Sequence, residues 1–85
     1  MSVADVIAKR IRTLCKQRNL STNKLATMSG VSQSTLASIL SGKVDSPKLD
    51  TVMQLAIGLN MNILEFLDDP DIVMYSFDES DEELE

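Results

Sequence analysis

Apolar side chains recur along most of the chain at the three- to four-residue spacing of an amphipathic α-helix. Val3, Ile7, Ile11 and Leu14 follow this spacing and predict a first helix over residues 3–18. The same spacing predicts further helices over residues 22–29, 33–41 and 49–58, and a fifth helix that begins after Asn62. The sequence contains no internal repeat, so the pattern predicts one all-α domain of five helices.

Residues that favour helix ends stand at the boundaries of these segments. Ser21 and Ser32 precede the second and third helices, where a serine hydroxyl can accept a hydrogen bond from the first turn. Gly30 and Gly42 follow the same two helices, and glycine readily adopts the left-handed conformation on which helices often end. Asn62 is followed three residues later by a glutamate, which is the pattern of a capping box.

One side of each predicted helix is apolar and is expected to form the core. Cys15 lies four positions after Ile11 on the apolar stripe of the first helix, so we expect a small buried residue rather than a redox switch. The other helices are expected to bury Leu25, Ala26, Met28, Leu36, Ile39, Leu49, Val52, Met53, Leu55 and Ala56.

The composition changes after Pro70. Residues 72–77 are apolar and predict either a short strand or a docked segment, whereas residues 78–85 hold six acids in eight positions and are expected to be disordered or loosely helical. We therefore divide the chain into a domain of residues 1–69 and an acidic tail of residues 70–85. The tail either keeps the protein in solution or docks on a partner subunit and builds a dimer, through Ile72, Val73, Tyr75 and Phe77.

The formal charge of −5 averages two unlike parts of the chain. Residues 1–67 carry all eight basic side chains and four acidic ones, and hence a net charge of +4. Residues 68–85 carry nine acids and no base, a net charge of −9. This asymmetry is typical of a basic binding module with an acidic tail.

Several classes of function have little support in the composition. One cysteine and no histidine leave almost no material for a zinc site or for Ser-His or Cys-His catalysis, so we expect no enzyme, metal, cofactor or small-molecule substrate. No apolar run approaches the roughly 18 residues that a membrane span needs. Charges interrupt the apolar pattern of the N-terminus, which therefore does not resemble a secretory signal, and we expect a cytoplasmic protein.

Two short helices joined by a turn at Gly30 form the helix-turn-helix pattern. On the second of them, Leu36, Ile39 and Leu40 share one side of the helix. The opposite side is an uncharged arc of Gln33, Ser34, Ala37, Ser38 and Ser41, with Thr35 at its border. In this motif the outward arc of the second helix enters the major groove of DNA.

The chemistry of the arc suits the edges of DNA bases. Gln33 can form two hydrogen bonds to adenine, and the hydroxyl groups of Ser34, Thr35 and Ser38 can serve several bases. The methyl groups of Thr35 and Ala37 can contact a thymine methyl. We therefore predict base contacts by these five residues of helix 33–41, inserted in the major groove.

Phosphate contacts supply most of the affinity for DNA and need not come from the helix that contacts bases. Lys24, Lys43 and Lys48 flank that helix in sequence, and the backbone N–H groups at the starts of the second and third helices offer further anion sites. We expect Lys9, Arg12 and Lys16 of the first helix to form a solvated face instead.

Residues 7–67 resemble the phage repressor and Cro-type helix-turn-helix domain, also called the XRE family. The segments that carry the resemblance are IRTLCKQRNLSTNKLA, GVSQSTLASILSGK and SPKLDTVMQLAIGLNMNILEFL. The resemblance implies a compact five-helix domain, like that of lambda repressor, which binds operator DNA as a homodimer. By analogy, Gln33, Ser34 and Ser38 face bases. The expected phosphate contacts are Thr22, Asn23, Lys24, Ser41, Lys43 and Lys48.

The chain departs from the family pattern at three positions. Thr22 stands where the family commonly has a longer glutamine, which helps to brace a phosphate contact. Cys15 and Leu40 replace an arginine and a glutamate that often pair across the first and third helices. Because both partners are replaced, no buried charge is left unpaired, and we expect the two side chains to pack together.

Two hypotheses of different classes follow. The first is a sequence-specific DNA-binding transcriptional regulator, a repressor, whose acidic residues 78–85 compete with DNA for the basic surface. The second is a protein-interaction module or antitoxin-like adaptor on the same fold, with weak or no DNA binding. The acidic total, the uncharged third helix and Thr22 favour the second hypothesis. The dependence of binding on salt discriminates between them.

Overall fold

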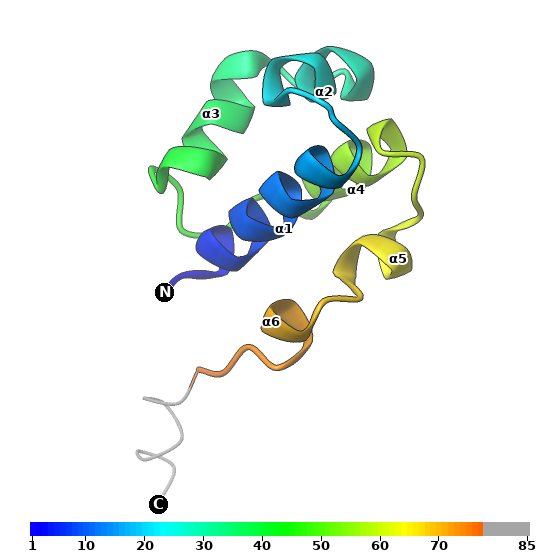
Figure 1. Cartoon of the computed structure of the whole chain (residues 1–85). Coiled ribbons are helices and arrows are strands. Elements are labelled where there is room, and N and C mark those ends of the chain that lie inside the picture. The colour runs from blue at the N-terminus through cyan, green and yellow to red at the C-terminus, as the bar shows by residue number, and fades with distance from the viewer. Residues whose placement is uncertain (78–85) are drawn as a thin grey trace, which may run out of the picture.

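The computed structural model describes residues 1–77, and this part of the chain is all-helical without a strand (Figure 1). The helices are α1 (Val3–Gln17), α2 (Thr22–Ser29), α3 (Gln33–Ser41), α4 (Leu49–Gly58), α5 (Ile63–Leu67) and α6 (Pro70–Val73). The all-α fold and the positions of the five predicted helices are confirmed. The short helix α6 follows them and was not predicted from the sequence.

The helix ends are built from the residues that the sequence suggested. The hydroxyl groups of Ser21 and Ser32 each accept a backbone N–H three residues later at 3.0 Å. Asn62 and Glu65 each accept the backbone N–H of the other at 2.8 Å, which completes the capping box of α5. The glycines that follow α2 and α3 have φ angles of 71° and 85°, in the left-handed region.

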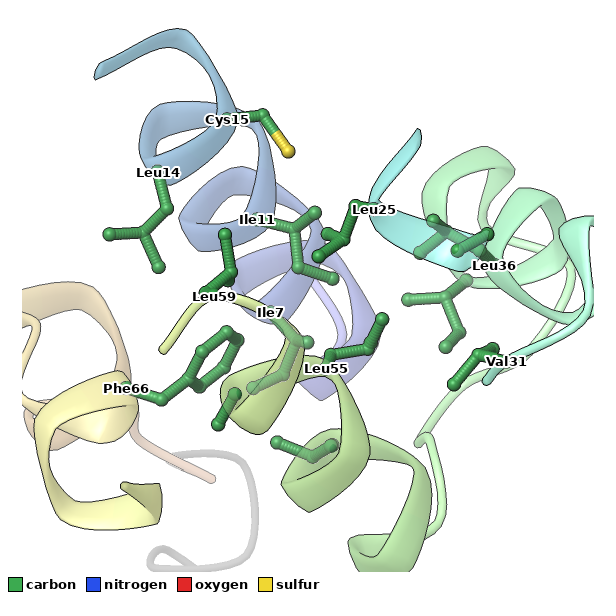
Figure 2. Packing of buried hydrophobic residues seen from close by; sticks show 14 residues of the cluster. Ile7, Ile11, Leu14, Cys15, Leu25, Val31, Leu36, Leu55, Leu59 and Phe66 are labelled. Atoms are coloured by element: carbon green, nitrogen blue, oxygen red, sulfur yellow. The ribbon is translucent and has the colours of Figure 1, made fainter. Parts of the chain in front are cut away.

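The core lies where α1 packs against α2 and α3, with α4 and α5 closing it from the other side. Ile11, Leu25, Leu55 and Phe66 are its largest fully buried side chains (Figure 2). Burial of each such side chain is worth about 1.5–3 kcal/mol. Cys15 is buried in the same core, and Leu40 packs partly buried against the core cluster, so neither residue is solvent-exposed. Direct contact between these two side chains stays a prediction.

Three of the residues predicted to be buried are exposed. Met28 is 51% exposed because it lies almost opposite Ala26 around α2. Leu49 is 65% exposed, since it begins α4 at the end that adjoins the loop of residues 43–48. Met53 is 42% exposed, because the short α4 buries only a narrow stripe and Met53 lies at the edge of it.

The segment after Pro70 docks on its own chain, and the alternative of a short strand is wrong. Lys9 Nζ of α1 and Asp71 Oδ2 of α6 form an ion pair at 2.7 Å. Ile72 packs partly buried against the core, and the Tyr75 hydroxyl donates a hydrogen bond to the Met1 carbonyl at 2.8 Å. The acidic run 78–85, predicted to be disordered and to compete with DNA, lies outside the described residues.

The predicted solvated basic face of α1 is confirmed, because Lys9, Arg12 and Lys16 are all exposed, although two of the three also make contacts within the chain. Lys9 is paired with Asp71, which raises the pKa of the Lys9 ammonium through a hydrogen bond and its charge. Arg12 is exposed, but its Nη2 donates a hydrogen bond to the carbonyl of Leu40 at 3.0 Å. Lys16 is exposed, as expected.

Candidate nucleic-acid interface

A tight turn joins α2 to α3. The Val31 N–H donates to the Ala26 carbonyl at 3.1 Å and thereby closes the end of α2, while Gly30 takes the left-handed conformation. The Val31 side chain is buried and anchors the turn in the core. Leu36 and Ile39, both 2% exposed, then fix one side of α3 on the core and turn its other side outward.

The outward side of α3 is polar and uncharged. Gln33, Ser34, Thr35 and Ala37 are exposed, and Ser38 is half-buried. Residues of this kind can form hydrogen bonds and methyl contacts with base edges without a charge that would have to be desolvated. As DNA contacts, the five residues stay a prediction.

The Thr35 hydroxyl is already engaged within α3. The Ser32 hydroxyl, which caps the helix, donates a hydrogen bond to Thr35 Oγ1 at 2.8 Å. Thr35 therefore keeps its own hydroxyl hydrogen and its methyl group for an external partner. A base contact through Thr35 uses one of these two groups or the remaining lone pair of Oγ1.

Two shallow hollows border the outward side of α3. One, of about 340 Å³, is lined by Ser34, Ala37, Ser38, Ser41 and Lys43. The other, of about 400 Å³, separates α3 from the start of α4 and is lined by Ser34, Thr35, Ser38, Ile39, Val44, Ser46, Pro47, Lys48 and Thr51. The structure thus brings Lys43 and Lys48 beside the predicted base-contacting residues.

Ser46 and Thr51 line the second hollow but were not predicted from the sequence. They share this lining with Ser34 and Ser38 of α3 and with Lys48. The available signal was the sequence SPK before α4, which places a small polar residue and a basic residue on a proline-containing loop. The pattern does not reveal that this loop approaches α3.

The predicted contacts at the start of α2 line neither hollow. Thr22 is half-buried, whereas Asn23 and Lys24 are exposed. The N–H groups of Lys24 and Thr35 are used by the capping serines of their helices. The prediction of backbone contacts to phosphate is therefore narrowed to the first two residues of α2 and α3, whose N–H groups have no partner within the helix.

The electrostatics of residues 1–77 depend on where their polar and ionisable groups lie. No charged or polar residue among them is buried as a whole, although the hydroxyl oxygen of the half-buried Ser29 is. Burial raises the pKa of the Cys15 thiol, which disfavours the thiolate form. No group of three or more His, Cys, Asp or Glu side chains in this part of the chain is placed to hold a metal ion.

The hydropathy of the helices gives one further finding. In residues 1–77, none of the helices combines the length and the apolar character that crossing a membrane requires.

The α2–turn–α3 unit, with an exposed polar side on its second helix and lysines beside it, defines a DNA-binding helix-turn-helix protein. The chain belongs to the helix-turn-helix family HTH_3, which matches residues 11–66 and confirms the resemblance to the XRE family. The crystal structure of the prophage Lp1 protein 11 is similar, with a TM-score of 0.74 and 26% sequence identity over 81% of this chain and 91% of that chain. A comparison with curated proteins finds no match.

Proposed function

We propose that the protein is a sequence-specific transcriptional repressor that inserts α3 into the major groove of an operator. The observation that carries the proposal is the exposed, uncharged side of α3, which shares its hollows with Lys43 and Lys48. A helix with side chains is about 10–12 Å across, and the major groove is about 12 Å wide. A cytoplasmic protein without enzymatic activity is part of the same proposal.

The roles within the interface divide by chemistry. The base contacts are Gln33, Ser34, Thr35, Ala37 and Ser38, and the phosphate contacts are Thr22, Asn23, Lys24, Ser41, Lys43 and Lys48. Ser46 and Thr51 add hydroxyl donors on the far side of the larger hollow, where one strand of the sugar-phosphate backbone fits. Occupation of the operator then represses by excluding other proteins.

The experiment is selection of bound duplexes from a random DNA pool, followed by titration of the selected duplex at several salt concentrations. A dimer that uses about three phosphates per half-site is expected to lose affinity with a log–log slope of about −5 on B-DNA. The alternative, a protein-interaction or antitoxin-like module, predicts that no duplex is enriched and that no such slope exists. That outcome would reject the repressor.

A homodimer completes the proposal, because two copies of α3 then lie about 34 Å apart, one turn of duplex. Ile72 and Tyr75 contact their own chain, which leaves the exposed Val73 and Phe77 for a partner subunit. Val73 also lines an open apolar depression with Leu64, which is 76% exposed. In Figure 1, α5 and α6 lie on the other side of α1 from α2 and α3, so pairing there leaves α3 accessible.

Sedimentation of the intact protein and of two matched variants tests this dimer. Leu64→Lys places a charge in the depression and is expected to shift the protein towards the monomer. Ile57→Lys adds the same charge at an equally exposed position of α4 and is expected to leave the dimer unchanged. Deletion of residues 71–85 should also give the monomer, and a dimer that survives both Leu64→Lys and the deletion would rule out this interface.

A further inference from the structure

The C-terminal end of α3 is joined to α1 through its backbone. Arg12 Nη2 donates a hydrogen bond to the Leu40 carbonyl at 3.0 Å. Leu40 belongs to the last turn of α3, where a carbonyl has no partner within the helix. The neighbouring carbonyls of Ser38 and Ile39 instead accept the N–H groups of the residues that follow α3. A charged guanidinium thus supplies a hydrogen-bond donor to a carbonyl at the C-terminal end of α3, the proposed DNA-contacting helix.

A second contact holds the loop that follows. The N–H of Ala4, in the first turn of α1, donates to the Asp45 carbonyl at 3.0 Å. Ala4 and Arg12 are eight residues apart, which is about 12 Å along a helix axis. Helix α1 therefore holds the end of α3 and the loop that carries Lys43 at two separate points.

Arg10 makes the same kind of contact at another place in the fold. Its Nε and Nη2 donate to the carbonyls of Phe66 and Glu65, at 2.8 and 2.9 Å, at the end of α5. Two arginines of α1 thus complete the C-terminal ends of two different helices. Only Arg12 acts on α3, so Arg10 supplies a control with the same charge and the same contact chemistry.

We propose that Arg12 is a positioning residue that sets the orientation of α3 relative to the rest of the domain. The start of α3 is fixed by its serine cap and by Val31 in the core, and Ile39 is buried near its end. Among residues 1–77, no side-chain ion pair holds that end. The inference rests on the proposed function, because the orientation matters for directional hydrogen bonds to bases. Phosphate contacts tolerate such a change better.

The experiment compares Arg12→Gln, Arg12→Lys and Arg10→Gln with the intact protein on the selected operator and on a scrambled duplex. Loss of a charge-assisted hydrogen bond predicts that Arg12→Gln lowers operator affinity about tenfold more than it lowers affinity for the scrambled duplex. The salt slope is expected to equal that of Arg10→Gln, and Arg12→Lys is expected to recover part of the specificity.

Two results would overturn the proposal. If Arg12 contacts phosphate instead, Arg12→Gln lowers both affinities in the same ratio, and the slope falls by about 0.9 per subunit relative to Arg10→Gln. If Arg12 is merely solvated, the specificity of Arg12→Gln equals that of Arg10→Gln.

Amide hydrogen exchange without DNA separates this inference from the proposed function. The N–H groups of Gly42 and Lys43 close the end of α3 and report on its order. Arg12→Gln is expected to speed their exchange about fivefold or more relative to Arg10→Gln. In the intact protein, opening of the helix end must break the hydrogen bond from Arg12 to the Leu40 carbonyl, and in the variant this cost is absent. If the intact protein selects no duplex, the proposed function fails. Faster exchange then still supports the tether, whereas unchanged exchange rejects it.

Discussion

At the scale of single residues, the contact between Gly58 and Ser29 brings α2 close to α4. A Cβ atom at Gly58 would overlap the Ser29 hydroxyl oxygen and lie 3.1 Å from the Ser29 Cα. The φ angle of Gly58 is not positive, so the glycine is required by this approach and not by its backbone conformation. The Ser29 hydroxyl is buried there and, within residues 1–77, finds no hydrogen-bond partner.

We predict that Gly58→Ala lowers the free energy of unfolding by about 1–3 kcal/mol through overpacking. Ser29→Ala is expected to leave stability unchanged or to raise it by up to about 1 kcal/mol, because it removes an unpaired buried hydroxyl. The double variant should lose less than the sum of the single effects. Urea denaturation of the three variants measures these values, and strict additivity would show that the two residues do not share this contact.

Single residues also mark what the sequence could and could not predict. Asn19 and Asn60, at predicted helix ends, have φ angles of 53° and 60°, since asparagine tolerates this conformation. The exposure of Met28 follows from its helical spacing relative to Ala26, whereas that of Met53 was not predictable in the same way. Local conformation depends on a few neighbours in sequence, whereas burial depends on how far the neighbouring helices extend.

At the scale of elements, a cap at each end sets the bounds of α3. The Ser32 hydroxyl accepts the Thr35 N–H at its start, and Gly42 in the left-handed conformation ends it. The sequence predicted both bounds of this helix because each depends on a residue with a specific local preference. The hydrogen bond from Arg12 to Leu40 was not predictable, since it requires α1 and α3 to be packed.

We predict that Ser32→Ala lowers the free energy of unfolding by about 1 kcal/mol, the usual value of a serine N-cap. Ser41→Ala is the matched control, because Ser41 is exposed and its hydroxyl makes only a 3.4 Å contact to the Ser38 carbonyl. Thermal and urea denaturation compare the two variants. Equal stabilities would indicate that the cap does not stabilise α3.

Helix α6 could not be predicted at this scale. It has only four residues, and a helix that short does not form alone. The Asp69 carboxylate caps its start by accepting the N–H groups of Asp71 and Ile72. Docking through Lys9 and Ile72 then supplies the tertiary contacts that hold the turn against α1.

At the scale of the whole molecule, the distribution of charge matters more than its sum. The total of −5 suggests a protein that avoids DNA, whereas residues 1–67 carry a net charge of +4. The family and the motif were predictable, because the helix spacing and caps are local. The residues that line the second hollow were not predictable, because Ser46 and Thr51 come near Ser34 and Ser38 only through the packing of α4 against the rest of the fold.

The central claim is that the outward side of α3 contacts base edges, and Gln33→Ala tests it most directly. The measurement is the affinity of intact and variant protein for the selected operator and for operators with each base pair changed in turn. We predict a loss of about 1–3 kcal/mol on the operator, relaxed preference at one base-pair position, and an unchanged salt slope. A variant that binds every duplex as the intact protein does would contradict the account.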